Sequence, residues 1–214
     1  MNVPLGTGPI WHPEVIEQST DAALRAIAAA ELGASFYLAG GTGLALRLGH
    51  RRSVDLDFFT EDRIDEDALL RELRGLGPIS VMAKAKETLD VHLLDTKVSF
   101  LGYPYPVLFS LDSYSGIPVA DPRDIACMKI SAISSRGTRR DFTDLYWVCK
   151  TYGLDELLGL FERKYASVRF NRVHVLKSLV YFEDAEKDPP PALLIDLSWQ
   201  ELKDFFLREI PRLL

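Results

Sequence analysis

The sequence predicts an α+β fold with two lobes: a mixed lobe over residues 1–115 with a small sheet flanked by helices, and an all-helical lobe over residues 116–214. Short apolar runs typical of strands are confined to residues 36–102. After Gly116 the apolar residues repeat at intervals of three and four, as they do on helices. The chain has 214 residues, of which 47% are hydrophobic and 26% charged, which fits one large globular domain or two small ones.

In the first lobe, helical and strand-like patterns alternate. Thr42 is a suitable N-cap for the helix that follows the Gly40-Gly41 turn, and Gly49 is a suitable end for it. The prolines of residues 103–106 end the last strand. The predicted order is helix 13–32, strand 36–39, helix 42–48, strand 54–59, helix 65–76 and strands 79–84, 88–94 and 97–102.

The second lobe opens at Asp121-Pro122, in the favoured order of a capping residue followed by proline at the first helical position. Three consecutive prolines at 189–191 form a stiff spacer. Helical periodicity predicts helices over about 122–135, 138–151, 154–165, 171–182 and 198–212.

Composition excludes several classes of protein. With 25 Lys+Arg against 31 Asp+Glu the net charge is −6, which argues against non-specific coating of nucleic acid. No apolar run approaches the ~20 residues of a membrane span, and the N-terminus lacks the pattern of a signal peptide. Cys127 and Cys149 stand alone, and the four histidines lack zinc-site spacing. We therefore expect a cytoplasmic protein without a membrane segment.

Two motifs together point to nucleotide chemistry. Asp55 and Asp57 lie two apart on a predicted strand, so their carboxylates share a face and repel unless a cation lies between them. Mg²⁺ carrying nucleotide phosphates suits such oxygen ligands. The turn Gly40-Gly41-Thr42 opens a helix whose free N–H groups, with the Thr42 hydroxyl, can hold phosphate. Each motif alone is ordinary, a solvated strand face or a simple turn, but their strand–turn–helix–strand order predicts a site for NTP and Mg²⁺.

This order resembles the AbiEii/AbiGii nucleotidyltransferase toxins of the DNA polymerase β-like nucleotidyltransferase superfamily. The resemblance implies that the glycine turn grips the triphosphate and that Asp55 and Asp57 bind metal, with Arg52 as a weaker phosphate ligand. From the residues alone, His50-Arg51-Arg52 is better explained as the basic end of a helix. Ser99 stands where the wider superfamily has a third carboxylate, and none of the nearby Asp90, His92 and Asp95 can be assigned to that role. A single Mg²⁺ arriving with the nucleotide is therefore expected.

The helical lobe supplies a lysine and a second acidic pair. Lys129 has apolar neighbours at three and four residues, so it either snorkels along the surface or points its ammonium into the cleft. Asp141 and Asp144 share a helical face near a helix start, where acidic residues favour the helix dipole. The family has a Lys followed by Arg-Asp-x-x-Asp-Leu. The resemblance thus implies that Lys129 binds phosphate and that Asp141 or Asp144 is the general base, a choice left open.

The expected activity is transfer of a nucleotidyl group from NTP–Mg²⁺ to an acceptor. The resemblance favours a tRNA 3′ end over a protein hydroxyl and implies a cognate antitoxin. One alternative is a non-enzymatic NTP-binding module, favoured by Ser99; another is an antibiotic nucleotidyltransferase, which needs an acidic acceptor pocket. Tyr103, Tyr105 and Tyr114 could stack on bases but suit packing better. The following basic residues are solvated helix faces or a funnel for an RNA end: Arg123, Arg136, Arg139, Arg140, Arg163, Lys164, Arg169 and Arg172.

Overall fold

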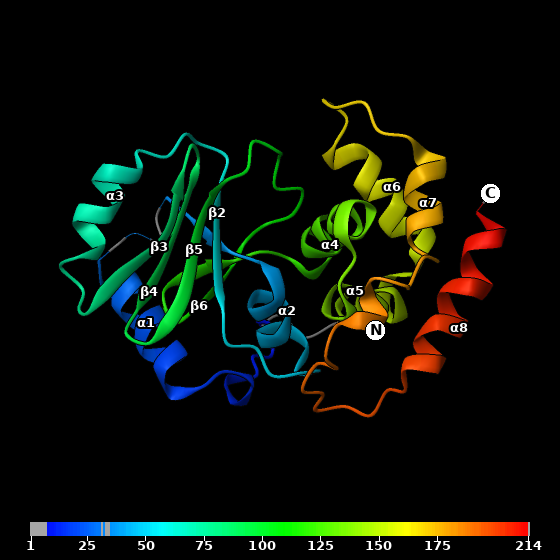
Figure 1. The fold of residues 1–214 in the computed structure, drawn as a ribbon, viewed down its shortest axis with the longest axis horizontal. Coiled ribbons are helices and arrows are strands. Elements are labelled where there is room, and N and C mark those ends of the chain that lie inside the picture. Colours follow the sequence, from blue (N-terminus) through cyan, green and yellow to red (C-terminus); the bar gives the residue numbers. More distant parts are fainter. Residues whose placement is uncertain (1–7, 31, 33–34, 214) are drawn as a thin grey trace, which may run out of the picture.

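The computed structural model describes residues 8–30, 32 and 35–213, and it has the predicted α+β architecture. Figure 1 shows the sheet in one lobe, with α1 and α3 on its outer side, and the helices α4 to α8 gathered in the other lobe. No helix in the described part has the length and apolar character required to cross a membrane.

The helices and strands follow the predicted order closely. The strands are β1 Tyr37–Leu38, β2 Leu56–Thr60, β3 Ile79–Ala85, β4 Thr88–Leu93, β5 Thr96–Gly102, β6 Asp112–Tyr114 and β7 Ile117–Val119. The α-helices are α1 Gln18–Ala29, α2 Gly40–Leu48, α3 Glu66–Leu73, α4 Pro122–Arg136, α5 Arg139–Tyr152, α6 Leu154–Lys164, α7 Arg172–Ser178 and α8 Trp199–Glu209. Short 3-10 helices are η1 Pro13–Val15, η3 Ala185–Lys187 and η4 Ile210–Arg212.

The strand order within the described residues is β3-β4-β5-β2-β1-β7-β6. β2 runs parallel to β5 and antiparallel to β1. In this register Asp57 on β2 lies opposite Ser99 on β5, and Ser99 lies opposite Asp90 on β4. The carboxylate strand is therefore at the middle of the sheet, with paired strands on both sides.

Two hydrophobic cores flank the sheet. Phe58, with Phe100 of β5, packs into the core beneath α1 and α3. Phe59 and Tyr37 instead join the core of the helical lobe. Because side chains alternate along a strand, Asp57 lies on the same side of β2 as Phe59. The side chain of Asp57 therefore points toward the helical lobe.

The boundary between the lobes differs from the predicted one at residues 115 and 116. A hairpin of β6 and β7 crosses that point, and β7 pairs in parallel with β1 through Leu38 and Val119. The sheet lobe therefore extends to Val119, and the helical lobe begins with α4, which Asp121 caps through the N–H of Arg123. Strands of three residues are too short to show a period in the sequence.

Several helices also differ from their predicted limits, α3 and α8 by ending three residues early. The helix expected over residues 13–32 is divided into η1 and α1, and residue 31 lies outside the described part. The predicted helix over 171–182 ends at Ser178. α2 begins at Gly40, so Thr42 lies inside its first turn and is not its N-cap; Gly49 does end it, with a left-handed φ of 64°.

The segment 188–194, here called the proline strap, ties the helical lobe back to the sheet lobe. The N–H of Arg52 donates to the carbonyl of Ala192 at 2.8 Å, and the N–H of Leu194 donates to the carbonyl of His50 at 2.9 Å. Arg51 and Leu193 form an isolated antiparallel bridge. The strap thereby fixes the loop that leads into β2.

Candidate active site between the lobes

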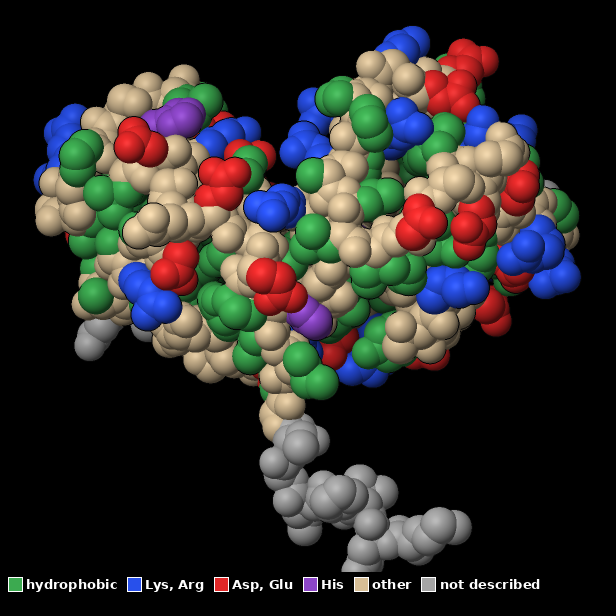
Figure 2. Space-filling model, turned by 90° about the horizontal axis from the view of Figure 1, so that it is seen from below, with side chains coloured by type: hydrophobic (Ala, Val, Ile, Leu, Met, Phe, Trp, Pro, Cys, Tyr) green, Lys and Arg blue, Asp and Glu red, His purple; other side chains and the backbone are tan. Residues whose placement is uncertain are grey.

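A polar cavity of about 230 Å³ lies between the two lobes. Figure 2 shows a notch between the lobes with Lys and Arg side chains along its edges. The sheet lobe provides its carboxylates, and α4 and α5 provide the opposite wall. The cavity is lined by Gly41, Arg51, Ser53, Asp55, Asp57, Lys97, Lys129, Arg136, Thr138, Arg140 and Asp141.

Asp55 and Asp57 face this cavity with little positive charge against them. The Asp55 side chain is 35% exposed, and its Oδ2 lies 3.8 Å from Nη1 of Arg140. Burial raises the pKa of Asp57; Lys129 opposes that rise and Asp55 adds to it. A cation beside the two carboxylates would offset both the burial and their mutual repulsion.

The donor set fits a magnesium ion that arrives with a nucleotide. Within the described residues no group of three His, Cys, Asp or Glu side chains is arranged to hold a metal. Mg²⁺ is commonly bound by one or two carboxylates, with water and substrate phosphates completing its octahedron. Asp55 and Asp57 can supply the two carboxylate ligands of such a site, and water and nucleotide phosphates would supply the others.

The two glycines of the turn lie directly against Asp57 and Arg51. Gly40 has a φ of +61°, and a Cβ there would overlap the Asp57 carboxylate. A Cβ at Gly41 would overlap the guanidinium of Arg51. Both positions therefore require glycine, and the first turn of α2 presents its unpaired N–H groups beside Asp57.

The Thr42 hydroxyl serves the scaffold and is not free for phosphate. Thr42 is only 1% exposed. Its Oγ1 lies 2.7 Å from the Ser53 hydroxyl and donates a hydrogen bond to the backbone carbonyl of Asp55. The predicted phosphate contact is thus corrected: Thr42 fixes the start of β2, which positions Asp55.

Asp144 is the centre of a buried charge network. Its carboxylate accepts from Arg51 Nε at 2.7 Å and Nη2 at 2.9 Å, and it lies 2.8 Å from both His50 Nε2 and Lys129 Nζ. Burial would raise the pKa of Asp144, but Lys129 and Arg51 outweigh it and hold this pKa well below its usual range. Asp144 is 0% exposed, so its carboxylate is closed to an acceptor hydroxyl in this structure.

Sequence reasoning missed His50 and Arg51 in this network. Both follow the Gly49 that ends α2, which made them look like the basic end of a helix. Arg51 is buried, whereas Arg52 is exposed and lines a neighbouring cavity. The spacing alone does not reveal which of two adjacent arginines turns inward.

Lys129 and Asp141 meet at the wall of the central cavity. Lys129 Nζ lies 2.8 Å from Asp141 Oδ1 and 2.8 Å from Asp144 Oδ2, and its side chain is 11% exposed, so it does not snorkel. Burial would lower the pKa of Lys129, but Asp144 and Asp141 outweigh it and raise this pKa. Asp141 Oδ2 accepts from the Thr138 hydroxyl at 2.6 Å and from its N–H at 3.2 Å, forming the capping box of α5. Asp141 is thereby held rigidly at the cavity edge.

Two larger cavities adjoin the central one. A cavity of about 460 Å³ shares Arg51 and Arg140 with it and is bounded by Arg52, Val54 and the prolines of the strap. A more apolar cavity of about 300 Å³ shares Lys129 and Asp141 with it. The apolar cavity is further lined by Gly40, Phe59, Tyr103, Met128, Ser131, Ala132 and Ser135.

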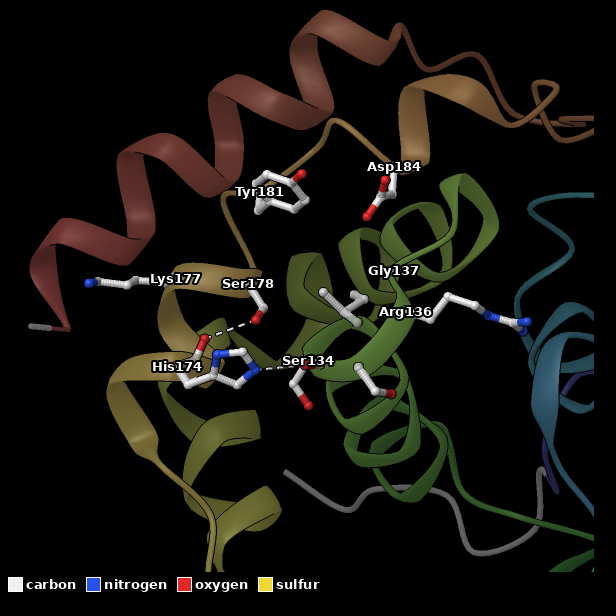
Figure 3. Close-up of a pocket in the computed structure, with 10 residues that line it drawn as sticks. Ser134, Arg136, Gly137, His174, Lys177, Ser178, Tyr181 and Asp184 are labelled. Atoms are coloured by element: carbon white, nitrogen blue, oxygen red, sulfur yellow. Dashed lines mark hydrogen bonds between the residues drawn. The ribbon is translucent and has the colours of Figure 1, made fainter.

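A fourth cavity, of about 340 Å³, lies between the end of α4 and α7. Figure 3 shows Arg136 pointing from it toward the sheet lobe, away from His174. His174 Nε2 lies 2.8 Å from the Ser134 carbonyl oxygen, so this ring joins α7 to α4. Arg136 is the residue that this cavity shares with the central one.

Only part of the predicted basic funnel borders the site. Arg136 and Arg140 line the central cavity. Lys164 is buried and pairs with Asp124 at 2.8 Å, so it serves the core of the helical lobe. Arg123 pairs with Asp121 at 2.8 Å and Arg172 with Glu162.

The three tyrosines considered for base stacking mainly pack within the protein. The hydroxyl of Tyr103 is hydrogen-bonded to that of Tyr165, and Tyr103 also borders the apolar cavity. Tyr105 packs between the rings of Tyr103 and Tyr165, and Tyr114 packs on Trp11.

Comparison with known proteins agrees with this geometry. The sequence model of a family described as nucleotidyl transferase AbiEii toxin, type IV TA system, matches residues 22–79 and 85–213. An uncharacterized protein of Aquifex aeolicus (strain VF5), aq_aa25, is 40% identical over 181 residues, which cover 82% of this chain and 86% of that protein.

Solved structures share the fold. The nucleotidyltransferase toxin MenT4 of Mycobacterium tuberculosis superposes with a TM-score of 0.55 at 16% identity, covering 91% of this chain and 84% of that one. JHP933 of Helicobacter pylori gives a TM-score of 0.53 at 20% identity, covering 92% and 90%. The fold of this chain is therefore one that the nucleotidyltransferase toxin MenT4 also adopts.

Proposed function

The chain belongs to the AbiEii nucleotidyltransferase toxin family, and from that membership we propose that it transfers the nucleotidyl group of an NTP–Mg²⁺ complex to an acceptor hydroxyl between its lobes. The observation that carries this proposal is the central cavity, where Asp55 and Asp57 face Lys129 and Asp141 across the interface of the lobes. A carboxylate at the edge of this cavity can accept the proton of an acceptor hydroxyl, a step that nucleotidyl transfer needs and NTP binding alone does not.

Each side of the triphosphate has a partner in this proposal. Asp55 and Asp57 would hold one Mg²⁺, which supplies neutralisation of phosphate charge. Gly40 and Gly41 leave the N–H groups of the first turn of α2 open to phosphate oxygens. The Lys129 ammonium has three donors, of which Asp141 and Asp144 take two, so one remains for a phosphate oxygen.

Asp141 is the proposed general base. It accepts the proton of the acceptor hydroxyl, whose oxygen forms a bond to the α-phosphorus while the bond to pyrophosphate breaks and pyrophosphate leaves with the electron pair. The hydrogen bonds from Thr138 and the ion pair with Lys129 orient the carboxylate before the acceptor arrives. Catalysis in this scheme comes from positioning and charge neutralisation.

The adjoining cavities suggest where the two substrates lie. The apolar cavity beside Phe59, Tyr103 and Met128 suits the nucleobase of the NTP. The larger cavity under the proline strap carries Arg52 and Arg140, which suit the phosphates of an acceptor strand. This cationic edge supports an RNA acceptor, with the tRNA 3′ end as our choice, over a small hydroxylated amine. A cognate antitoxin is the protein partner that the family description suggests.

The test uses purified protein, each α-³²P-labelled NTP, Mg²⁺ and total tRNA. We expect label on tRNA with the native chain and none with the double variant Asp55→Asn/Asp57→Asn. Asp62→Asn, an exposed aspartate just after β2, is the matched control and should retain activity. Label on protein would replace the tRNA acceptor with a protein hydroxyl. NTP binding without release of pyrophosphate, with every acceptor tried, would refute the transferase.

A further inference from the structure

We propose that the ammonium of Lys97 takes the electrostatic place of a second metal ion, so that this site works with one divalent cation and one lysine. This inference rests on the proposed function and adds a residue to it. It starts from Ser99, which stands where a third carboxylate is expected and which, as a hydroxyl, brings no charge to a second ion.

The strand register puts Lys97 beside the carboxylates. β2 and β5 are parallel neighbours in which Leu56 is level with Val98, and Asp57 with Ser99. Asp55 directly precedes Leu56 and Lys97 directly precedes Val98, so the two residues flank the first pair of this ladder. Adjacent strands are about 4.8 Å apart and residues two apart share a face, so Lys97 stands next to Asp55 on the side toward the helical lobe. Lys97 accordingly lines the central cavity with both aspartates.

Among the cations that line the central cavity, Lys97 and Arg136 have no carboxylate partner in the described part of the chain, and Lys97 is the one that stands on the strand beside Asp57. Lys129 is paired with Asp141 and Asp144, Arg51 with Asp144, and Arg140 with Asp55. In the described part of the chain Lys97 forms no such ion pair, and its charge acts on Asp57, where it opposes the effect of burial. Its ammonium is thus available to a phosphate oxygen.

Asp90 does not supply the missing carboxylate instead. It is level with Ser99 on the far side of β5, two strands away from Asp57. The charge of Asp90 reaches Asp57, whose pKa it raises, but Asp90 is not among the residues that line the central cavity, whereas Lys97 is. Lys97, one strand away, is the nearer charge.

A lysine suits this role chemically. In two-metal sites the second ion neutralises charge on the attacking and leaving oxygens. An ammonium is a compact charge with three donors, so it can neutralise an oxygen of the α-phosphate without needing ligands of its own. The cost of losing such a preorganised donor is typically 10²–10³-fold in kcat.

The experiment counts bound metal and measures turnover. Mn²⁺ is titrated into the protein and followed by electron paramagnetic resonance, with each α,β-methylene NTP added singly as a non-reacting nucleotide. We expect one Mn²⁺ per native chain, one in Lys97→Met, and two in the double variant Lys97→Met/Ser99→Asp. In the labelled transfer assay Lys97→Met should lose about 10²-fold or more in kcat, with little change in KM for NTP. Lys84→Met, an exposed lysine on β3, is the matched control and should match the native chain in every measurement.

The outcomes separate the two proposals. Two Mn²⁺ in the native chain, or a Lys97→Met variant with native kcat, would overturn the role of Lys97 and leave the nucleotidyltransferase intact. Absence of any nucleotide-dependent Mn²⁺ binding would overturn both. Thermal unfolding of each variant, compared with the native chain, shows that a loss of kcat does not come from a loss of folded protein.

Discussion

Replacing Asp144 by asparagine should lower the free energy of unfolding of this protein by a large fraction. The substitution tests whether Asp144 has a structural role. The native carboxylate lies 2.7–2.9 Å from four nitrogen atoms of Arg51, Lys129 and His50. Asparagine keeps one acceptor oxygen and turns an amide N–H₂ toward donors. Lys129 retains Asp141, but Arg51, which is 3% exposed, is left without a carboxylate.

Removing one partner of a buried ion pair typically costs about 3–5 kcal/mol. Because whole domains are stable by only about 5–15 kcal/mol, this loss should shift the midpoint of urea unfolding strongly. The assay is urea denaturation at pH 7 and 25 °C, followed by circular dichroism. Asp196→Asn, at an exposed site, is the control and should stay within about 0.5 kcal/mol of the native chain.

The reasoning would be refuted by a folded Asp144→Asn variant within 1 kcal/mol of the native chain that nevertheless fails to transfer nucleotide. Such a result would return Asp144 to the chemistry as a charge that acts on the substrate. The opposite pattern, lost stability with transfer retained in the folded fraction, would assign Asp144 to the scaffold.

Three further predictions follow from particular contacts. The pKa of Asp144 is lower in the folded than in the unfolded chain, so its carboxylate stabilises the fold fully above the unfolded pKa of about 3.9, and this stabilisation is lost as the pH falls below that value. The difference in unfolding free energy between the native chain and Asp144→Asn should therefore shrink by about 1.4 kcal/mol per pH unit below about pH 3.9. An equal difference at pH 3 and pH 7 would contradict this prediction. Gly41→Ala places a Cβ against the guanidinium of Arg51, so it should lower the free energy of unfolding by about 1–3 kcal/mol and weaken NTP binding measured by calorimetry. The control Gly159→Ala, whose Cβ would lie in open space on α6, should raise the free energy of unfolding by about 0.5–1 kcal/mol. Lys164→Met leaves Asp124 buried without its cation and should cost about 3–5 kcal/mol in urea unfolding, while NTP affinity per folded molecule stays native; a fall in that affinity would link this pair to the site.

Local rules predicted the parts of the site that depend on nearby residues. Asp57 lies on β2 and Asp55 directly precedes its first residue, Leu56, and both line the central cavity; Asp121-Pro122 starts a helix as expected. Such features follow from strand periodicity and capping chemistry within a few residues. The α+β class was recoverable for the same reason, whereas the family was indicated by the order of the glycine turn and the Asp55-Leu56-Asp57 motif.

What the sequence did not reveal depends on residues far apart in the chain. Arg51 turns inward because Asp144 lies beneath it and because the proline strap bonds the backbone on both sides of it. Thr42 faces Ser53 and Asp55 only once β2 is in place. Arg51 and Thr42 could each have played several structural roles. Contacts with residues distant in the sequence determine which role each one has, and no local sequence pattern contains that information.

The proline strap also sets an order for making the enzyme. A ribosome releases residues 37–60 long before residues 188–194, so the glycine turn and Asp55 emerge without the segment that bonds the loop of His50 and Arg52. A chain halted before residue 188 already carries Lys129, Asp141 and both aspartates, yet it lacks the backbone hydrogen bonds that hold this loop. The geometry of the candidate site is thereby completed late in the translation of this chain, and truncated products of synthesis carry the residues of the site without its final arrangement.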